Sequence, residues 1–426
     1  MKPVSDRANW RRLLQTVEMR RVVPQSDSLL AKRVLIAVGN YPPGYGGAGL
    51  RVHRTYQRLR QRLPLDLQAA TVSGRGDMAD CTEFEGVPIF QTGADTGFIA
   101  QFLDIGRLFL GKGSRRFDIV HALGQSGIAT AAASWALLLN IPVVRELTVN
   151  QPISLSPRPV ATIRRLTFRR SKLVVALNAG LKARLIDAGV APQRIWERPN
   201  PVDTAVFSRP NQDQRRRARQ NYGLEGDGPV HLLLGRICAR KNQLFALDAL
   251  AKLPDEHRLL LLGPALRGDQ KYVAAVFKKI SDLRVEQRVV FQPCHIDDAQ
   301  QAYHASDCCW IPSTHEGMPN VLLEALVCGL PVVVNRSLDL NDHIAERVNG
   351  FASNLTPDEF ANSVRATLEE LADDDSSKRI SKIASERYGA LKIDEEFAER
   401  LARLLRISTD TVTTTVGEAA GSRGHG

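Results

Sequence analysis

The chain has 426 residues, which is too long for one ordinary hydrophobic core and predicts two domains. Hydrophobic residues make up 43% and aromatic residues 6%, an ordinary globular composition that disfavours a platform of stacked rings for single-stranded nucleic acid. The net charge of +11 favours an anionic partner such as a nucleotide diphosphate, a lipid phosphate or a membrane surface, and its spread along the chain argues against a nucleic-acid-binding stripe.

The six cysteines predict free thiols, because none of them forms a C-x-x-C pair. We therefore expect a reducing compartment, the cytoplasm, rather than a disulfide framework or a zinc site. The N-terminal residues contain no long apolar run, so we expect no signal peptide. Residues 1–30 form a basic extension, for which a membrane-surface contact and an ordinary packed extension are alternatives.

The first domain is expected at residues 31–205. It begins with a strand at residues 33–39, a nearly all-apolar run that is typical of a strand covered on both faces. A glycine-rich loop and a helix at about residues 48–63 follow, with apolar residues at helical spacing. Further strands are expected at residues 67–72, 117–121, 142–147 and 173–177.

An uncharged stretch lies between Asp118 and Arg145, long enough to span a bilayer. His121, Asn140 and Pro142 interrupt it. We therefore interpret the stretch as a strand, a loop, a buried helix and the next strand.

The second domain is expected at residues 206–385. Proline-rich residues 197–203 and the polar stretch 211–221 are interpreted as the link to it. The βα pattern then restarts, with strands at residues 231–235, 258–263, 289–292, 308–312 and 331–335 and helices at residues 243–253, 271–283 and 320–328. A helix within residues 386–406 is expected to pack back towards the first domain, and residues 407–426 to be disordered. The alternation predicts an α/β fold of two Rossmann-like, doubly wound domains facing each other across a cleft.

The strongest functional signal is the segment STHEGMPNVLLEA at residues 313–325. It follows an apolar strand, and Pro319 suits the first turn of a helix. Glu316 is therefore expected in the loop before that helix, and Glu324 about one turn inside it. A helix N-terminus presents unpaired N–H groups and a positive dipole end to a phosphate, while nearby carboxylates can bind hydroxyl groups.

These two glutamates, in an EG-x-P-x-x-x-x-E setting, resemble the E-x7-E motif of retaining glycosyltransferases of the group 1 type, which have the two-Rossmann GT-B fold. The resemblance implies that Glu316 faces the donor sugar at the reaction centre and that Glu324 holds the ribose hydroxyls of the nucleotide. It also implies donor contacts from the residues around the helix start, Gly317, Met318, Pro319 and Asn320. The structural alternative is two surface glutamates that flank a helix start.

A second signal is the loop LGRICARKN at residues 234–242, which begins where a predicted strand ends. It is similar to the G-R-x-x-x-x-K element of the same family, whose arginine and lysine bind the donor diphosphate. The resemblance implies this catalytic role for Arg236 and Lys241, because fixed cations stabilise the charge that develops on a departing diphosphate. Arg240 is a further cation without an assigned use, and a solvated basic loop is the alternative.

The glycine loop at residues 44–49 formally matches G-x-G-x-x-G. Four residues separate it from the preceding strand, and no acidic residue ends the next strand, so a dinucleotide fingerprint is disfavoured. The resemblance implies instead that Gly46 and Gly47 let the backbone approach the donor from the first domain. A turn that simply needs glycine is the alternative.

Two features of the first domain leave questions open. Many family members carry a histidine after the strand aligned with residues 142–147, and this chain has none there; His121 precedes a different loop. The helix at residues 48–63 carries arginines on its predicted polar side, which suit either an anionic lipid-linked acceptor or bilayer, or plain solvent. These arginines are Arg51, Arg54, Arg58, Arg60 and Arg62.

The resemblance implies an enzyme that transfers a sugar from a nucleotide diphosphate sugar to a hydroxyl of a saccharide or lipid-linked acceptor, with retention of anomeric configuration, in surface polysaccharide or glycolipid synthesis. We expect no metal or other cofactor and no nucleic acid, and a cytoplasmic location, with peripheral contact at the inner face of an anionic membrane as one interpretation. The alternatives are a nucleotide-sugar epimerase of the same architecture and a catalytically inactive nucleotide-sugar-binding member. A nicotinamide oxidoreductase is disfavoured by the glycine-loop spacing.

Overall fold

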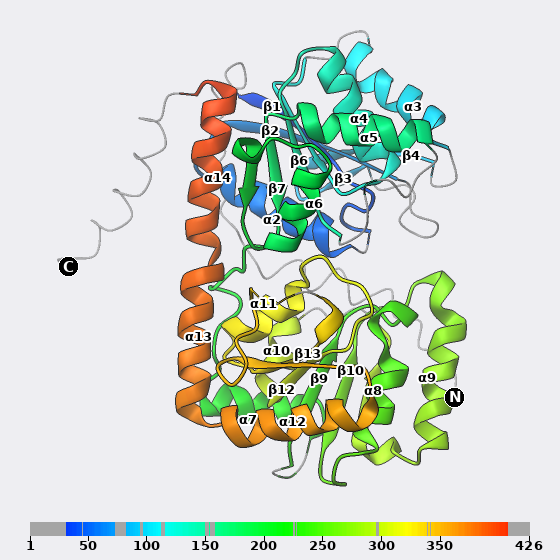
Figure 1. Cartoon of the computed structure of the whole chain (residues 1–426), viewed down its shortest axis with the longest axis vertical. Helices are drawn as coiled ribbons and strands as arrows, with labels where there is room; N and C mark the ends of the chain where they lie inside the picture. Colours follow the sequence, from blue (N-terminus) through cyan, green and yellow to red (C-terminus); the bar gives the residue numbers. More distant parts are fainter. Residues whose placement is uncertain are drawn as a thin grey trace, which may run out of the picture. The chain divides into compact units, whose positions relative to one another are not determined.

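The computed structural model describes residues 31–407, except residues 45, 73–81, 94–96, 112–115, 150–152, 154–157, 225, 227, 295–297, 339 and 341. The predictions for residues 1–30 and 408–426 therefore lie outside the described residues. The described chain contains two sheets with helices between their strands, so the α/β prediction is confirmed (Figure 1).

The first sheet has the strand order β3-β4-β2-β1-β5-β6-β7-β8 among the described residues. Neighbouring strands are parallel, except for the short antiparallel pair β3 and β4. The strands are β1 (Lys32–Ala37), β2 (Leu65–Val72), β3 (Glu83–Phe84), β4 (Val87–Thr92), β5 (Ile119–Leu123), β6 (Val143–Leu147), β7 (Leu173–Ala176) and β8 (Ile195–Glu197). The helices are α2 (Gly47–Leu59), α3 (Phe98–Leu110), α4 (Gly127–Leu138), α5 (Arg158–Arg170) and α6 (Ala179–Asp187).

The second sheet is parallel throughout its described strands, in the order β11-β10-β9-β12-β13-β14. Its strands are β9 (Val230–Leu234), β10 (Arg258–Leu262), β11 (Val289–Gln292), β12 (Cys308–Ile311), β13 (Val332–Asn335) and β14 (Gly350–Ser353). Its helices are α7 (Gln212–Asn221), α8 (Gln243–Leu250), α9 (Gln270–Asp282), α10 (Ala299–Ala305), α11 (Asn320–Val327) and α12 (Pro357–Leu371).

Apolar runs in the sequence predicted most of these strands because the strands are buried. The side chains of β5, β6 and β12 are buried along their whole length, as expected for parallel strands covered by helices on both faces. The uncharged stretch between Asp118 and Arg145 is β5, α4 and β6, as predicted. Among the described residues, no helix combines the length and apolar character needed to cross a bilayer.

The interpretation of residues 211–221 as part of a linker is wrong, because Gln212–Asn221 form helix α7. Asn211 and Gln214 make a capping box, in which each side chain binds the backbone N–H of the other. The helix is held by arginine contacts: Arg215 and Arg219 both bind the Asp307 carboxylate, which lies before β12. Its polar composition therefore reflects ion pairs rather than a loop.

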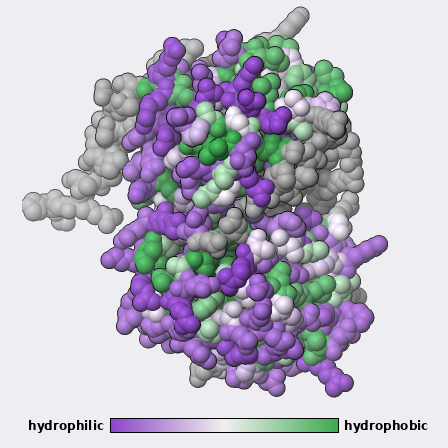
Figure 2. Space-filling view, viewed as in Figure 1, coloured by the Kyte–Doolittle hydropathy of each residue, from purple (hydrophilic) through white to green (hydrophobic). Residues whose placement is uncertain are grey.

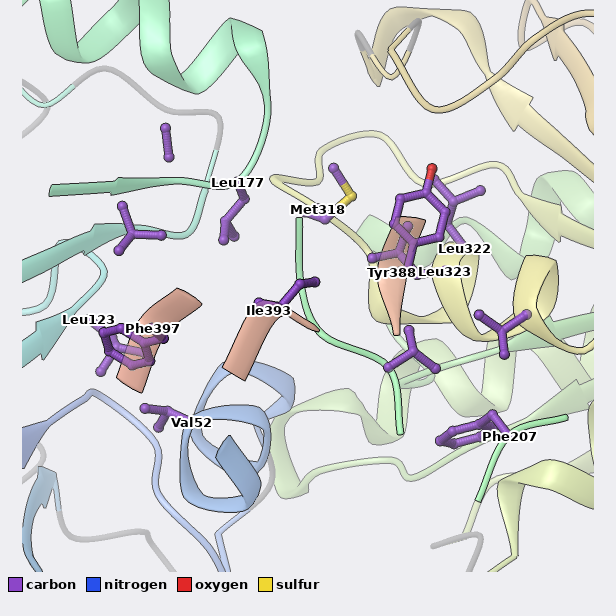
Figure 3. Packing of buried hydrophobic residues seen from close by; sticks show 14 of the residues in the cluster. Val52, Leu123, Leu177, Phe207, Met318, Leu322, Leu323, Tyr388, Ile393 and Phe397 are labelled. Carbon is purple, nitrogen blue, oxygen red and sulfur yellow. The ribbon is translucent and has the colours of Figure 1, made fainter. Parts of the chain in front are cut away.

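Two further helices, α13 (Asp374–Tyr388) and α14 (Ala390–Leu405), meet at Gly389. Helix α13 contacts α11, and α14 contacts α2. The buried side chains of both helices belong to one hydrophobic cluster that contains residues of both sheets. Figure 3 shows Phe397 of α14 beside Leu123 and Val52, and Tyr388 of α13 beside Leu322 and Leu323 of α11.

The expected polar side of α2 is largely occupied by protein contacts, which corrects the solvent- or membrane-facing interpretation for three of its arginines. Arg51 is buried and pairs with Glu146. Arg58 pairs with Asp394, and Arg62 with Glu395 at 3.1 Å, both on α14. Arg54 and Arg60 remain exposed. Helix α14 therefore covers much of the surface that the helical pattern had assigned to solvent or lipid.

Candidate functional site

The loop between β12 and α11 carries the residues predicted to be most important. Pro319 is the N-cap residue, and α11 begins at Asn320, so Glu316 lies in the loop and Glu324 lies inside the helix, as predicted. Asn335 donates from Nδ2 to the Ser313 carbonyl oxygen at 2.9 Å. The Thr314 N–H donates to the Arg240 carbonyl oxygen at 2.9 Å, which joins this loop to the basic loop that follows β9.

Glu316 forms ion pairs with two basic side chains. Its Oε1 lies 2.7 Å from Lys241 Nζ and 2.8 Å from Arg240 Nη1, and its side chain is 10% exposed. Burial acts to raise the pKa of Glu316, but the ion pairs with Lys241 and then Arg240 outweigh it and hold the pKa below its ordinary value. A carboxylate that is both buried and ionised beside two cations is suited to electrostatic work on a bound ligand.

Lys241 reaches Glu316 because the backbone of the basic loop makes room for it. Gly235 has a φ of +148°, and a Cβ there would lie 3.0 Å from the Lys241 Cε, so a larger residue would be strained and crowded. A short 3-10 helix, Ala239–Lys241, turns the chain back towards β12. Asn242 then adopts the left-handed conformation, with a φ of 62°, and donates from Nδ2 to the Pro312 carbonyl oxygen at 3.2 Å.

Arg236 comes from the same loop but binds a different carboxylate. Its Nε and Nη2 donate to Asp269 Oδ2 and Oδ1 at 2.6 and 2.9 Å. Burial acts to raise the pKa of Asp269, but hydrogen bonds from Arg236 and the Leu266 N–H lower it overall. The structure therefore brings Lys241 to Glu316, while Arg236 is held against Asp269, which the sequence analysis did not single out.

Glu324 is buried and hydrogen-bonded to a tyrosine. Tyr303 of α10 donates from its hydroxyl to Glu324 Oε2 at 2.6 Å. Burial raises the pKa of Glu324, and this effect exceeds the lowering by the Tyr303 hydrogen bond and by the cations Arg54 and Lys241.

Two asparagines from the first sheet hold the predicted donor loop, and the sequence analysis gave neither a site role. Asn178, the N-cap of α6, donates from Nδ2 to the Gly317 carbonyl oxygen at 2.8 Å. Asn200 donates from Nδ2 to the Met318 carbonyl oxygen at 3.1 Å and to Asn320 Oδ1 at 2.7 Å. The sequence signal for Asn178 was weak, because a polar residue following an apolar strand is common in α/β proteins.

The predicted glycines lie beside the start of α11. Gly46 is the N-cap of α2 and Gly47 its first residue, and a Cβ on Gly47 would lie 3.5 Å from Asn320 Nδ2. Gly317 is closer still to the first sheet, because a Cβ there would lie 2.1 Å from the Thr148 carbonyl oxygen. The loops that follow β1, β6 and β12 therefore meet at residues 317–320.

A buried charged cluster supports these loops from within the first sheet. Glu146 of β6 is fully buried and pairs with Arg51 of α2 and with Arg198, whose Nη2 lies 3.2 Å from Oε2. His121 Nε2 lies 3.9 Å from Glu146 Oε2, and its Nδ1 lies 3.1 Å from the Tyr56 hydroxyl oxygen. Burial lowers the pKa of His121 to about 3, so its imidazole is neutral at pH 7.

A pocket of about 430 Å³ opens beside Asn178 and Arg198. It is also lined by His343 and Asp342, which follow β13, and by Arg387 at the end of α13. Glu316, Lys241 and Glu324 are not among its lining residues; a cavity of about 10 Å³ lies next to Lys241. The predicted residues are therefore closely packed in this structure, and the larger of these two openings is lined by other residues.

Solved structures share this fold over most of the chain. The structure of HepE from Anabaena in complex with UDP superimposes with a TM-score of 0.74 and 22% identity, over 87% of this chain and 100% of that chain. Sucrose-phosphate synthase from Thermosynechococcus elongatus gives a TM-score of 0.73 at 15% identity, over 88% of this chain and 100% of that chain. At these low sequence identities, the structural similarity shows the fold alone, which is GT-B.

The sequence also matches two family models and several curated relatives. Residues 45–206 match Glycosyltransferase Family 4, and residues 228–370 match Glycosyl transferases group 1. Both matches are to glycosyltransferase domains, which supports placing this chain among the GT-B glycosyltransferases. It is 28% identical over 280 residues to a sulfoquinovosyl transferase of Arabidopsis thaliana, covering 63% of this chain and 52% of the plant protein. It is 28% identical over 296 residues to a D-inositol 3-phosphate glycosyltransferase of Xylanimonas cellulosilytica, covering 64% of this chain and 69% of that protein.

A shorter match reaches higher identity. A GDP-mannose-dependent phosphatidylinositol monomannoside mannosyltransferase of Mycolicibacterium smegmatis is 37% identical over 147 residues, which is 33% of this chain and 37% of that protein. The chain thus matches about half the length of the plant relative and little more than a third of the mannosyltransferase.

Proposed function

We propose that this protein transfers a sugar from a nucleotide diphosphate sugar to a hydroxyl group of an acceptor, with retention of anomeric configuration. The observation that carries the proposal is the ion-pair cluster of Glu316, Lys241 and Arg240 in the loop before α11, placed against the first sheet at Gly317 and Asn320. HepE, which shares the fold, has been solved with UDP and with UDP-glucose, which supports a donor of this class.

Four of the predicted residues have roles in the proposed reaction. Lys241, with Arg236, neutralises the charge that develops on the departing diphosphate, and the N–H groups at the start of α11 bind its oxygens. Glu316 faces the donor sugar, and Glu324 binds the ribose hydroxyls. Arg236 must exchange its contact with Asp269, or share it, when the diphosphate binds.

In this proposal, donor binding also requires Asn178 and Asn200 of the first domain to separate from residues 317–320. The contacts of Asn178 and Asn200 with residues 317–320 leave little space at Glu316 in this structure. We propose that these contacts open to admit the donor and that Gly46 and Gly47 then approach it from the first sheet. No metal is used in this proposal, because Lys241 and the helix start supply the positive charge.

The acceptor is proposed to be a saccharide or a lipid-linked molecule in surface polysaccharide or glycolipid synthesis. The relatives named above include enzymes for sulfoquinovosyl transfer, for inositol 3-phosphate and for a phosphatidylinositol monomannoside. Their names span both soluble and lipid-bearing molecules, so they support the class and not one member of it. A cytoplasmic location with peripheral membrane contact is part of the same proposal.

The test combines a binding screen with product analysis. Uridine, guanosine and adenosine diphosphate sugars are added in turn, and the one that raises the melting temperature is the donor, since a ligand of the native state stabilises it. The labelled donor is then incubated with candidate acceptors, with and without EDTA. A glycosylated acceptor, or slow donor hydrolysis with retention in both buffers, supports the proposal. An epimerised donor indicates the epimerase alternative, and binding without turnover indicates an inactive member.

A further inference from the structure

Large apolar side chains are exposed on helices α3, α4 and α5 of the first domain. We call this surface the α3–α5 face and define it by Ile99, Leu103, Leu110, Leu138 and Leu166. The first four of these side chains are between 62% and 75% exposed, and Leu166 is 41% exposed. Figure 2 shows hydrophobic surface over the part of the molecule where Figure 1 places α3 and α4.

Helix α3 carries this pattern along its length. Ile99, Leu103 and Leu110 have the helical spacing of one side, with Arg107 between them, and that side faces solvent. The opposite side is already used, because Phe102 and Phe109 stack on Trp135 of α4 with ring centroids 4.9 and 6.4 Å apart. The exposed leucines are therefore not needed for packing against the sheet.

The three helices bring their ends together at one edge. Helices α3, α4 and α5 each return from the carboxyl end of one strand to the amino end of the next parallel strand, so their C-termini share an edge of the sheet. Leu110 and Leu138 are in the last turns of α3 and α4, and Leu166 is near the end of α5. These three side chains therefore lie towards the same edge of the sheet, on helices that contact one another in the order α3, α4, α5.

The same edge is strongly basic. Exposed cations follow Leu166 along the chain: Arg169 and Arg170 end α5, and Lys172 comes next. Among the described residues, no carboxylate pairs with any of these three side chains. The sequences of α3, α4 and α5 contain a single acidic residue, Asp104, which pairs with Arg107 at 3.0 Å.

We propose that the α3–α5 face docks onto an anionic lipid surface, with Leu103 and Leu110 inserted among the acyl chains and Arg169, Arg170 and Lys172 at the headgroups. Exposed apolar residues beside unpaired cations are the combination that binds such a surface. A second copy of the chain is disfavoured as the occupant, because two basic edges would repel each other. The proposal goes beyond the transfer reaction and does not depend on it.

The test is sedimentation of the full-length chain with vesicles of phosphatidylcholine alone or mixed with phosphatidylglycerol, with no substrate present. Binding is expected to the anionic vesicles and to weaken as salt is added. Leu103→Ser with Leu110→Ser, and separately Arg169→Glu with Arg170→Glu, should each weaken the partition constant by roughly tenfold or more. The matched controls are Phe277→Ser with Leu391→Ser, and Arg216→Glu with Arg217→Glu, exposed pairs on other helices, which should bind like the parent protein.

Three outcomes would overturn the proposal. One is equal binding to neutral and anionic vesicles. The second is a loss of binding on Arg11→Glu with Arg12→Glu in the basic extension, while both α3–α5 face variants bind normally. The third is a concentration-dependent dimer, seen by light scattering, that Leu103→Ser with Leu110→Ser abolishes in a chain that binds no vesicle. Because no step of the test measures sugar transfer, failure of the proposed enzymatic function would leave its result unchanged.

Discussion

Gly317 approaches Thr148 so closely that a Cβ on Gly317 would lie 2.1 Å from the Thr148 carbonyl oxygen. This contact joins the loop before α11 to the loop after β6, which belong to different sheets. Gly317→Ala should therefore keep the two loops apart and displace Glu316 with them. We expect the kcat/KM for sugar transfer to fall by at least about tenfold, since small misplacements in a site have large effects.

The matched control for this variant is Gly97→Ala, because a Cβ at Gly97 has no heavy atom within 4 Å among the described residues. Gly97→Ala should leave kcat/KM unchanged. Equal activity of the Gly317→Ala and parent proteins would show that the contact with Thr148 is not part of the active arrangement.

Glu316 is expected to be needed for turnover and not for nucleotide binding. Its carboxylate is held between Lys241 and Arg240, so Glu316→Ala removes a negative charge from beside the proposed diphosphate. We expect kcat to fall by roughly 10²–10³, in line with the loss of one electrostatic contact in a preorganised site. Calorimetry should show nucleotide diphosphate affinity equal to or higher than that of the parent. Full activity of the variant would remove Glu316 from the mechanism.

Single substitutions of Lys241 and Arg236 are expected to weaken nucleotide diphosphate binding to different extents. Lys241 already lies at Glu316, whereas Arg236 must leave or share Asp269 to reach a ligand. Lys241→Ala should weaken nucleotide diphosphate binding by roughly tenfold or more, consistent with a charged hydrogen bond. Arg236→Ala should have a smaller effect, and the double variant the largest. Titrations that give three unchanged dissociation constants would refute the diphosphate assignment.

The contact between α2 and α14 is expected to stabilise the fold. Arg58 is the partner of the buried Asp394, whose pKa is raised by burial despite that partner. Arg58→Ala should lower the free energy of unfolding by about 2 kcal/mol, because it leaves a buried carboxyl group without its donor. Arg60→Ala, at the exposed C-cap of α2, should change the free energy of unfolding by less than about 0.5 kcal/mol. Chemical denaturation measures both, and equal values would contradict the prediction.

Stability is expected to fall as the pH falls from 7 towards 5. His121 has a pKa lowered to about 3 by burial, so the unfolded chain takes up a proton below pH ~6.5 that the native state does not. The contribution of neutral His121 to the free energy of unfolding is fully present above the pKa that this residue has in the unfolded chain. Below that pKa, the contribution is lost at about 1.4 kcal/mol per pH unit. His121→Asn should reduce the slope of the free energy of unfolding against pH by that amount between pH 6 and 5. Equal slopes for the His121→Asn variant and the parent protein would contradict the assignment.

Much of the fold could be predicted from the sequence because it depends on neighbours in the chain. Apolar runs predicted most strands of both sheets, although not β3, β4, β8 and β14, and helical spacing predicted α2 and α11. The short segment from Ser313 to Ala325 placed Glu316 in a loop and Glu324 in a helix, because a proline and a strand end are local signals. The prediction failed at residues 211–221, where polarity was interpreted as a linker and the structure has a capped helix.

The partners of the charged residues required the folded chain. Arg51 pairs with Glu146, 95 residues away, and Arg58 with Asp394, 336 residues away. Asn200 meets Asn320 across 120 residues. No local pattern specifies such pairs, because helix and strand periodicities extend over only a few residues, whereas these contacts arise when distant segments pack together. The arginines of α2 therefore look alike in sequence, yet burial separates Arg51 from Arg54.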